Sequence, residues 1–550
     1  MRRALFVLLN SISIIVSATD YYMSSSGNDQ ANGISPSTPW QSIAKLNTVL
    51  SGLKPGDRVL FKRGDTFNGS LHITASGTEG NPIVFSNYGT GSEPVISGFS
   101  TISDWTNNGR GIFSKVLECS SEPMMVVFDG ANTGMGRFPD NDWLTIDSHF
   151  GNTSLSDAEL NSSTINWTGA TVTIKVNRYT TNYLTIGSHS GNTINFPQGA
   201  SFELCDGFGY FIQNDLRTLT LFKEWYYDSK TSTFYMYFGV ESPLNHDVKV
   251  AAVDNGAVIT GAGYITIDGL SFQGFNVNAI DLNNAPHITI QNSIVRYIGN
   301  NAIDGNKSGY RTSSDFIFRN NNVSDVNNCG LFLFSQFTHA LIANNSISDV
   351  GLIFGTGYKK DLMSHSAIFI GNVGFDNLNT IIGYNRITNI GHRGISFLGT
   401  NITINNNLID AFCLKEDDAG GIYTYQETYE TRSCNVINNI ILNGVGNISG
   451  TTTPSYDRMA VGIYTDGFTR GINIEGNSVA FCTYSPGYFS NSNVHGNLIN
   501  NTFFANRYQI YTSGSIGLEY MTIQKNKFIC KSPFPSMTWF FYSNTGFPDN

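Results

Sequence analysis

Residues 385–426, NRITNIGHRGISFLGTNITINNNLIDAFCLKEDDAGGIYTYQ, contain a structural unit that occurs more than once. An apolar core position at Ile395 recurs 27 residues later as Ile422, and the tripeptide Asn385-Arg-Ile387 recurs as Asn407-Leu-Ile409. Short alternating stretches separated by Asn and Gly are typical of β-strands joined by turns. A unit of this size cannot bury its apolar face alone, so the repeat predicts a stack of coils, or solenoid.

The same unit recurs through the second half of the sequence, from about Ala251 onward. The apolar core position is occupied in turn by Ile280, Ile303, Leu331, Ile368, Ile395, Ile422, Ile463 and Ile510. A parallel series of asparagines, each followed two residues later by Ile, Val or Phe, comprises Asn292, Asn345, Asn385, Asn407, Asn477, Asn497 and Asn526. Asn tolerates left-handed backbone at tight turns, and stacked amides can bond the coils above and below. We therefore interpret these asparagines as structural rather than catalytic.

The composition favours an all-β fold and excludes several functions. Asn, Ser, Thr and Gly weaken helices, and units of this length suit a right-handed parallel β-helix with about three short strands per coil. The formal net charge is −10 with no cluster of Lys or Arg, which argues against a nucleic-acid partner. Seven cysteines without a C-x-x-C pair exclude the common zinc and redox motifs, so we interpret them as free thiols.

The N-terminus has the pattern of a secretory signal peptide, residues 1–18. Arg2 and Arg3 precede an apolar stretch, and Val16-Ser17-Ala18 provides small residues for cleavage. No later run is long enough to span a membrane. We expect a secreted or periplasmic protein that is a monomer and is not held in a membrane after cleavage.

Three further segments follow the signal peptide. Residues 19–118 are predicted to hold the first coils and a helix over 41–53 that caps the open end of the solenoid. Residues 119–250 are rich in strand formers but lack the repeat, which predicts an inserted antiparallel β domain. Residues 251–550 are predicted to form the main β-helix.

Several motifs resemble those of a known group of proteins. They are Tyr21–Trp40, Gly56–Asp65, Gly136-Arg137-Phe138-Pro139, Glu224-Trp225-Tyr226, Asp418-Ala-Gly-Gly-Ile-Tyr423 and Ile463-Tyr464-Thr-Asp466. The first two resemble secreted bacterial β-helix proteins of the pectate-lyase-like superfold, and the others resemble the β-helix glycoside hydrolases of family 141. The resemblance implies hydrolysis of plant cell-wall glycans, since that family includes fucosidase and xylanase activities.

Strand periodicity predicts which side chains point away from the solenoid. If the aligned isoleucines point inward, their neighbours point outward in columns spaced about 4.8 Å apart. One column is Asp281, Asp304, Phe332, Phe369, Ser396, Tyr423 and Tyr464. Two shorter columns place Tyr425 beside Asp466 and His365 beside His392. Sugars bind through aromatic stacking plus polar groups, so this face predicts a glycan groove.

Asp418 and Asp466 are the candidate catalytic pair, with their roles unassigned. Glycoside hydrolysis uses two carboxyl groups, separated by about 5–5.5 Å in retaining and about 6.5–9.5 Å in inverting enzymes. The parity of the strand places Asp466 on the outer face. Asp418 reaches the same place only if residues 417–421 form a tight turn, and the alternative is that Asp418 merely caps that turn.

Other polar residues near this pair are candidates for substrate binding. They are His392, Arg393, Tyr423, Tyr425, Tyr464 and His365. Arg393 in particular could bind an acidic sugar or hold a nucleophilic carboxylate ionised, and the alternative is a solvated pair at a strand end. Tyr423 and Tyr464 are also interpreted as packing residues.

Asp281 and Asp304 form a rival site. They align on adjacent coils, where two like charges call for a cation or a shared proton. A calcium ion there would indicate a polysaccharide lyase, and the alternative is two exposed aspartates beside turns.

The sequence thus predicts a hydrolase of plant or algal polysaccharide that needs no cofactor. Two alternatives stay open: a polysaccharide lyase, assisted by calcium, and a non-catalytic glycan-binding β-helix.

Overall fold

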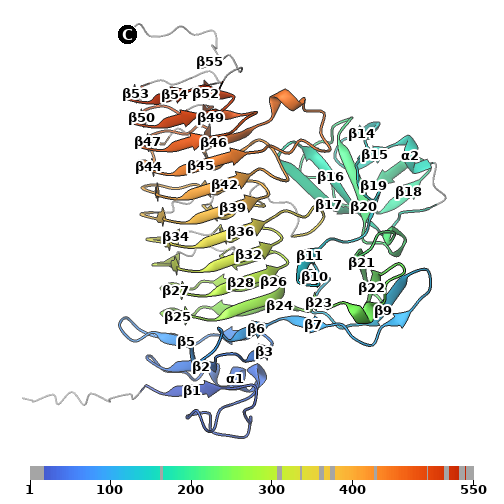
Figure 1. The fold of residues 1–550 in the computed structure, drawn as a ribbon, viewed down its shortest axis with the longest axis vertical. Coiled ribbons are helices and arrows are strands. Elements are labelled where there is room, and N and C mark those ends of the chain that lie inside the picture. Colours follow the sequence, from blue (N-terminus) through green and yellow to red (C-terminus); the bar gives the residue numbers. More distant parts are fainter. Residues whose placement is uncertain are drawn as a thin grey trace, which may run out of the picture.

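The computed structural model describes residues 18–540, apart from 162–164, 306–312, 335–336, 358–363, 372–377, 427–429, 492, 513–519 and 532–538. The predicted signal peptide, residues 1–18, lies outside the described residues except for Ala18. Parallel strands stack along one long axis, and an antiparallel body lies beside the stack (Figure 1). The predicted fold class, an all-β parallel β-helix with an antiparallel insert, is confirmed.

Each coil of the solenoid contributes one strand to each of three parallel faces. The first face runs, in spatial order, through β1 (Asp20–Met23), β2 (Arg58–Lys62), β5 (Ile83–Tyr88), β25 (Ile265–Asp268), β27 (Ile288–Gln291), β31 (Ile317–Arg319), β35 (Leu341–Ala343), β38 (Ile381–Gly383), β41 (Thr403–Asn405), β44 (Cys434–Ile437), β47 (Ile472–Glu475), β50 (Asn497–Ile499) and β53 (Thr522–Gln524). The step from β5 to β25 crosses the insert, so the coils on either side of it join into one stack.

The second face is paired in the same way. Its strands are β3 (Thr66–Asn68), β6 (Val95–Ser97), the first part of β26 (Ser271–Asn283), β28 (Ile294–Ile298), β32 (Asn322–Val326), β36 (Ser346–Val350), β39 (Arg386–Ile390), β42 (Leu408–Phe412), β45 (Ile440–Gly444), β48 (Ser478–Ala480), β51 (Thr502–Phe504) and β54 (Lys527–Ile529).

The third face carries the column of outward side chains described above. Its strands are β4 (Leu71–Ile73), β24 (Val253–Thr260), the second part of β26, β29 (Asn301–Asp304), β33 (Leu331–Leu333), β37 (Ile368–Ile370), β40 (Ile395–Phe397), β43 (Ala419–Gln426), β46 (Ala460–Gly467), β49 (Pro486–Ser490), β52 (Tyr508–Thr512) and β55 (Trp539–Phe540). The register pairs Ile395 with Ile422 and Ile422 with Ile463, as the repeat predicts.

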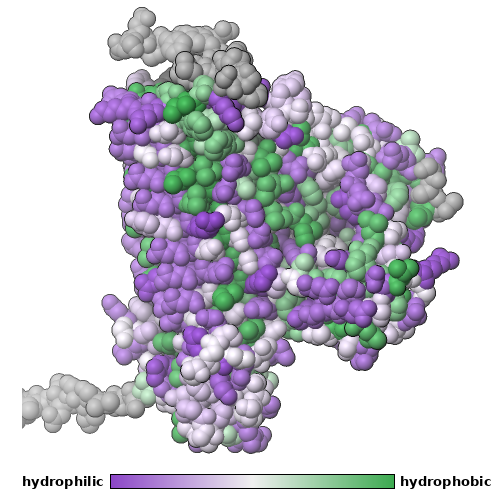
Figure 2. All heavy atoms as spheres, in the orientation of Figure 1, coloured by the Kyte–Doolittle hydropathy of each residue, from purple (hydrophilic) through white to green (hydrophobic). Residues whose placement is uncertain are grey.

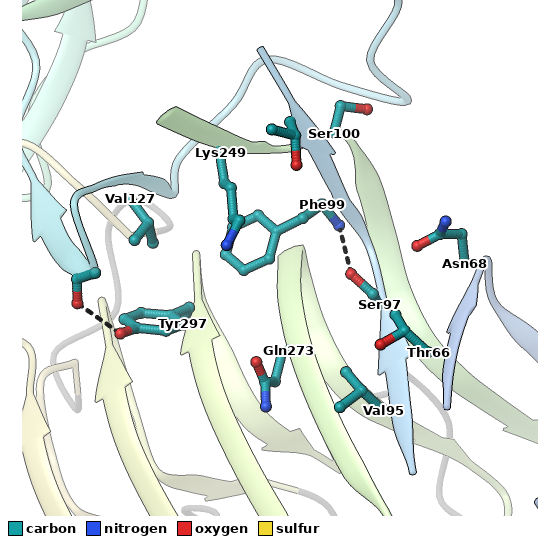
Figure 3. Close-up of a pocket in the computed structure, with 12 residues that line it drawn as sticks. Thr66, Asn68, Val95, Ser97, Phe99, Ser100, Val127, Lys249, Gln273 and Tyr297 are labelled. Atoms are coloured by element: carbon teal, nitrogen blue, oxygen red, sulfur yellow. Dashed lines mark hydrogen bonds between the residues drawn. The ribbon is translucent and has the colours of Figure 1, made fainter. Parts of the chain in front are cut away.

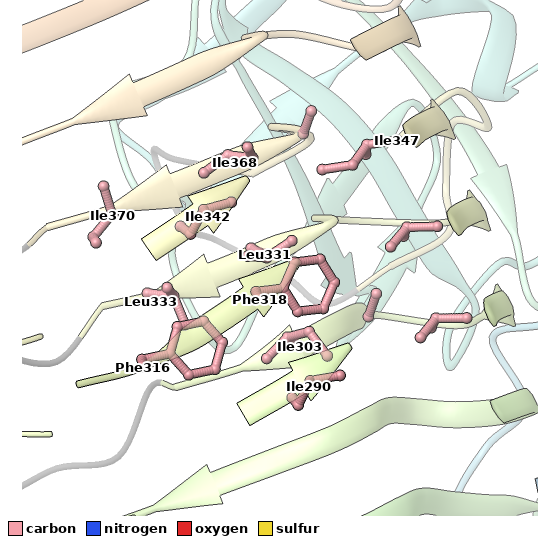
Figure 4. Close-up of a cluster of buried hydrophobic side chains, with 14 of the residues drawn as sticks. Ile290, Ile303, Phe316, Phe318, Leu331, Leu333, Ile342, Ile347, Ile368 and Ile370 are labelled. Atoms are coloured by element: carbon pink, nitrogen blue, oxygen red, sulfur yellow. The ribbon is translucent and has the colours of Figure 1, made fainter. Parts of the chain in front are cut away.

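The core is a continuous stack of aliphatic and aromatic side chains inside the coils. Figure 4 shows Ile303, Leu331 and Ile368 one above another, with Ile290 and Ile342 facing them from the first face. All five are fully buried. Burial of apolar surface at about 25 cal/mol per Å² stabilises each coil only when its neighbours are in place, which explains the extended fold.

Helix α1 (Ile43–Leu50) covers the N-terminal end of the stack. Ser42 caps it by accepting a hydrogen bond from the Lys45 backbone N–H, and its buried side chains Ile43, Leu46 and Leu50 join the solenoid core. The predicted capping helix is therefore confirmed, with narrower bounds than 41–53.

The insert consists of antiparallel sheets. One contains β7 (Phe99–Thr101), β10 (Val126–Phe128), β11 (Ala131–Thr133) and β23 (Val248–Ala251), and a second contains β8 (Thr106–Asn107), β9 (Ile112–Val116), β21 (Trp225–Asp228) and β22 (Thr233–Tyr237). A third contains β12 (Arg137–Phe138), β13 (Leu144–Thr145), β16 (Thr171–Asn177), β17 (Thr180–Thr185) and β20 (Gly209–Gln213). A fourth contains β14 (Ser148–Phe150), β15 (Ser154–Ser156), β18 (Ser188–Ser190) and β19 (Thr193–Asn195), with α2 (Ala158–Asn161) nearby.

The antiparallel strands begin at Phe99, earlier than the boundary at Cys119 that the sequence predicts. The last parallel strand before them, β6, ends at Ser97, and parallel pairing resumes at Val253. Buried hydrogen bonds join the two bodies, for example from Gln213 Nε2 to the Gly355 carbonyl at 2.7 Å.

Two general features of the chain bear on its function. All seven cysteines, each within the described residues, are free thiols. Across the part of the chain that the structure describes, no helix combines the length and apolar character needed to cross a membrane.

A ladder of buried asparagine amides runs along the turn between the first and second faces. The amide nitrogen of each member donates to the side-chain oxygen of the next at 2.9–3.1 Å. The members are Asn321, Asn345, Asn385, Asn407, Asn439, Asn477, Asn501 and Asn526. The structural role predicted for most of these asparagines is confirmed.

Two asparagines predicted for the ladder do not belong to it. Asn292 lies one residue before the ladder position, which is held by Ser293, and Asn497 lies within β50. Left-handed backbone is also found one residue before the ladder, as at Asn406, where φ is 55°. Amide stacking is present at this position too, because Asn292 has left-handed backbone, donates from its amide to Asp268 Oδ1 at 2.8 Å and accepts from the Asn320 amide at 3.2 Å.

Replacing Asn407 with alanine is expected to lower the free energy of unfolding by about 2–3 kcal/mol. The change leaves the buried amide and backbone N–H of Asn385 without their acceptor and removes a donor to the Ile382 carbonyl. Urea unfolding measures the loss. Asn473→Ala, at a partly exposed position on β47, is the control and is expected to change the value by less than about 0.5 kcal/mol.

Candidate functional site

Asp418 lies at a sharp turn immediately before β43. Its φ of 58° is in the left-handed region, but Ala419, Gly420 and Gly421 already belong to β43, so the change of direction is at Asp418 itself and does not extend over residues 417–421 as the tight turn considered from the sequence would. Burial raises the pKa of Asp418 to about 6. The positive charge of Arg178 lowers this pKa, and the charges of Asp417 and Asp466 raise it. No described residue donates a hydrogen bond to its carboxyl group.

Asp466 lies on the next coil, in β46, directly opposite Tyr425. Its carboxylate accepts hydrogen bonds from the Tyr423 hydroxyl at 2.8 Å, the Asn491 amide at 2.8 Å and the Gly467 backbone N–H at 2.7 Å. An ionised carboxylate accepts but does not donate, so these three donors suit the charged form.

The two aspartates lie on adjacent coils, in contrasting surroundings. The charge of Asp466 contributes to the raised pKa of Asp418, after burial and the charge of Asp417. Burial favours the protonated acid at Asp418, whereas the Asp466 carboxyl group accepts hydrogen bonds from three donors. Such a difference between neighbouring carboxyl groups is what acid–base chemistry requires.

Tyr423 and Tyr464 pack against each other beside Asp466. Their rings are 5.3 Å apart in an edge-on arrangement, and Tyr464 stacks on Phe489 at 4.7 Å. Burial and then the charge nearby raise the pKa of both tyrosines well above the usual value, so both stay protonated. The Arg393 guanidinium lies 4.8 Å from the centre of the Tyr423 ring, which places a positive charge at the same site.

The insert reaches this site through the turn between β16 and β17. Arg178 donates to Asp417 Oδ2 from Nε at 3.1 Å and from Nη2 at 2.5 Å. Burial raises the pKa of Tyr179, with further contributions from the charges of Asp418 and Asp466. Sequence reasoning missed both residues, because nothing in the turn marks it as lying beside a segment more than 200 residues away.

Behind Asp418 lies a fully buried charged cluster that also joins the insert to the solenoid. Glu416 Oε2 lies 3.0 Å from His365 Nδ1 and 3.6 Å from His392 Nδ1. Glu416 Oε1 accepts from Thr181 Oγ1 at 2.7 Å and lies 3.9 Å from Lys175 Nζ. We call these residues, with Lys415, the Glu416 cluster.

The charges of the Glu416 cluster are strongly coupled. Burial alone would raise the pKa of Glu416, but His365, Lys175 and His392 outweigh it and hold the pKa well below the usual value. Burial lowers the pKa of Lys415 to about 7, and burial followed by neighbouring cations lowers the pKa of both histidines. The cluster therefore holds one firmly ionised carboxylate among cationic and neutral groups.

The structure divides the predicted substrate-binding residues into two groups. Tyr423, Tyr425 and Tyr464 lie in the columns that the sequence predicts, and Arg393 lies over the Tyr423 ring. His365 and His392 lie in adjacent coils as predicted, but they are 3% and 0% exposed because the insert covers them. They are held within the Glu416 cluster and do not line an open groove.

The predicted outward column is confirmed in register but is covered for most of its length. Asp281, Asp304, Phe332, Phe369, Ser396, Tyr423 and Tyr464 pair successively across the third face. All are buried, whereas the sequence suggests an open groove. Figure 2 shows hydrophobic surface gathered on the side of the solenoid next to the insert, and hydrophilic surface along the opposite edge.

Asp281 and Asp304 are buried register partners rather than exposed aspartates. Asp304 Oδ2 accepts a hydrogen bond from the Asn301 amide at 2.9 Å. Within the described ranges, no group of three or more His, Cys, Asp or Glu side chains is arranged to hold a metal ion. The described side chains thus offer two carboxylates here and no third ligand of these types.

Comparisons with known proteins support the fold. No family model matches the chain. Over 86 residues the chain is 45% identical to a lacto-N-biosidase of Bifidobacterium longum subsp. longum, a match that covers 15% of this chain and only 5% of that protein. A solved structure described as a glycoside hydrolase superposes with a TM-score of 0.57 at 14% identity, covering 93% of this chain and 97% of that chain.

A second solved structure, XylC in complex with xylose, superposes with a TM-score of 0.51 at 11% identity and covers 92% of this chain and 86% of that chain. At such low identity these similarities show a shared fold. They confirm the architecture that the N-terminal motifs predict, and they extend over the insert as well as the solenoid.

Proposed function

We propose that this protein is a secreted carbohydrate-active enzyme that hydrolyses glycosidic bonds in plant or algal polysaccharide. Asp418 is the general acid, and Asp466 is the nucleophile or the base that activates water. The observation that carries the proposal is the pair itself: two carboxyl groups from adjacent coils, one with its pKa raised to about 6 and the other held by three hydrogen-bond donors.

The geometry suits the two roles. A protonated Asp418 donates its proton to the oxygen of the departing sugar, and no described group competes for that proton. Asp466 faces the anomeric carbon directly or through a water molecule. Tyr423 fixes the orientation of Asp466 through its hydroxyl, and Arg393 above the Tyr423 ring offsets the negative charge of the pair.

The aromatic side chains around the pair support a sugar substrate. Tyr179 from the insert and Tyr425 from β43 both lie partly exposed beside the aspartates. Aromatic rings with a polar end bind the apolar faces of sugars while hydrogen-bonding their hydroxyls. The insert would then form one wall of the substrate site.

The named relatives favour the same substrate class. The matched protein of Bifidobacterium longum is named for an action on a sugar, and XylC was solved with xylose. The resemblance to family 141 favours plant cell-wall glycans, and the N-terminal pattern favours secretion. A lyase would instead release an unsaturated sugar, so absorbance from a new double bond during digestion would contradict hydrolysis.

Replacing Asp418 with asparagine is expected to lower hydrolysis of a polysaccharide by about 100- to 10,000-fold, the usual contribution of a general acid. In the native protein, kcat/KM is expected to fall as pH rises through about 6, because the acid must be protonated. Release of reducing sugar from xylan at pH 4–9 measures both effects. A nitrophenyl glycoside, whose leaving group needs no proton, should show a much smaller loss with the variant.

Stability provides the control for this variant. The pKa of Asp418 is raised in the folded state, so the aspartate stabilises the fold least above pH 6 and most below about 4. Asp418→Asn should therefore raise the melting temperature at pH 7 while activity is lost. A loss of activity together with a lower melting temperature would instead indicate damage to the turn, and an unchanged rate would exclude Asp418 as the acid.

A further inference from the structure

A cavity of about 730 Å³ lies between the first coils of the solenoid and the edge of the insert, away from the aspartate pair. Strands β3, β6, β26 and β28 form one wall, and β7, β10 and β23 form the other (Figure 3). On the second face, β28 is the wall strand nearest to β42 and lies four coils from it, which is about 19 Å at the spacing of parallel strands. Its volume is within the range of ligand sites, about 300–1,000 Å³.

One wall of the cavity is a column of hydrogen-bonding side chains. Asn68, Ser97 and Gln273 pair in register on three adjacent coils, so their side chains project from the same face about 4.8 Å apart. The Gln273 amide nitrogen donates to Ser271 Oγ at 2.9 Å, which fixes the side chain where it borders the cavity. Repeated amide and hydroxyl groups of this kind match the hydroxyls of a sugar chain.

Two aromatic rings, one from each wall, border the cavity. Phe99 projects from β7 toward the cavity, and its ring lies 6.0 Å from that of Tyr297 (Figure 3). Tyr297 is fixed by a hydrogen bond from its hydroxyl to the Gly130 carbonyl at 2.6 Å. A Cβ atom at Gly274 would lie 2.3 Å from the Phe99 ring, so the ring packs closely on bare backbone and is held in place.

The charge of the lining favours a neutral ligand. Lys249 is the one charged residue among those that line the cavity, and its Nζ lies 2.8 Å from Asp247 Oδ2. A cation that is already paired with a carboxylate attracts an anion weakly, whereas its remaining N–H groups can still donate to hydroxyls. Aromatic rings close to polar amides, with little net charge, are the chemistry that binds an uncharged sugar.

We propose that this cavity is a second, non-catalytic binding site for a neutral oligosaccharide segment of the substrate. The proposal rests on the proposed function, because a polysaccharide chain is the ligand that would engage both sites of one molecule. Binding at the cavity holds the polymer on the solenoid while the aspartate pair acts on another part of the same chain. Two sites joined by one ligand raise the local concentration of the bond to be cleaved.

Calorimetric titration with xylohexaose and with cellohexaose tests the proposal. The titrated protein carries Asp466→Asn, so that the probe is not consumed. We expect two classes of site for at least one probe. Adding Asn68→Ala with Gln273→Ala should weaken one class at least tenfold and leave the other. Both residues are partly or fully exposed, and an unchanged melting temperature checks the fold.

The control is Thr388→Ala, four coils further along the same column as Gln273, which should leave both classes unchanged. Binding that is unaffected by the paired substitution, or no binding that depends on Asn68 and Gln273, would overturn the proposal. The outcome is separable from the proposed function: loss of one binding class in a protein that cleaves no glycan would leave the cavity site standing. Cleavage of glycan by a protein whose binding does not depend on Asn68 and Gln273 would leave the proposed function standing and overturn the cavity site.

Discussion

Replacing Asp466 with asparagine is expected to lower glycan hydrolysis by about 1,000-fold or more while the protein remains folded. The variant keeps the shape of the side chain but removes the charge that attacks the anomeric carbon or activates water. An amide oxygen can still accept from the Tyr423 hydroxyl or the Gly467 N–H, although one of the three donors loses its partner. The free energy of unfolding should therefore change by no more than about 2 kcal/mol.

The measurement is the initial rate of reducing-sugar release, with urea unfolding of the same preparations. Asp410→Asn serves as the matched control, because Asp410 lies partly exposed on β42 and accepts a hydrogen bond from the Asn443 amide at 2.7 Å. That variant should retain nearly full activity. A rate for Asp466→Asn within tenfold of the native rate would exclude Asp466 from the chemistry.

The stereochemistry of the product then separates the two roles open to Asp466. If the carboxylate attacks carbon, the sugar is released with its configuration retained, and if it activates water the configuration inverts. Proton NMR of the first product formed distinguishes them.

Most of the solenoid could be predicted because its rules are local. The alignment of Ile422 with Ile463 and the alternation of strand side chains place Tyr423 beside Tyr464 and Tyr425 beside Asp466, and the register agrees. The same alternation places the inward isoleucines in the core. These features depend only on neighbouring coils, which repeat the same sequence pattern.

The parts that could not be predicted depend on contacts between distant segments. His365 and His392 are outward by parity, but whether an outward residue is exposed depends on the insert that covers it. Arg178 and Tyr179 come from a turn with no motif, and they reach Asp417 and Asp418 only in the folded protein. Asp418 lies between these cases: Gly420 and Gly421 suggest a tight turn in the sequence, but both belong to β43, and the left-handed backbone is at Asp418 itself.

Replacing Glu416 with glutamine is expected to cause the largest loss of stability, about 3–5 kcal/mol at pH 7. Glu416 is 2% exposed and is the carboxylate that faces His365, His392 and Lys175 at the centre of the cluster. Glutamine has nearly the same shape but no charge. Loss of the Glu416 charge leaves the fully buried Lys175 without the carboxylate nearest its ammonium group. An uncompensated buried charge is strongly destabilising.

The pH dependence identifies the cause of the loss. Burial lowers the pKa of Lys175 and brings that of Lys415 to about 7, and removing Glu416 lowers both further. Unfolded lysines bind more protons than these folded ones, so the stability of the variant should rise between pH 7 and pH 9. Melting temperatures of native protein and variant should therefore approach each other as pH increases. A difference in melting temperature that is the same at every pH would show that the shape of the side chain, not its charge, accounts for the loss of stability.

A double variant supplies the control. Adding Lys175→Met to Glu416→Gln removes the unpaired cation and keeps the volume of the side chain. The double variant should be more stable at pH 7 than Glu416→Gln alone, and the difference measures the coupling between the two charges. A double variant that is less stable by the sum of the single effects would show that the two charges act independently. If the double variant recovers both stability and hydrolysis, the Glu416 cluster serves to hold the insert in place. The insert in turn holds Arg178 and Tyr179 close to the segment that contains Asp418.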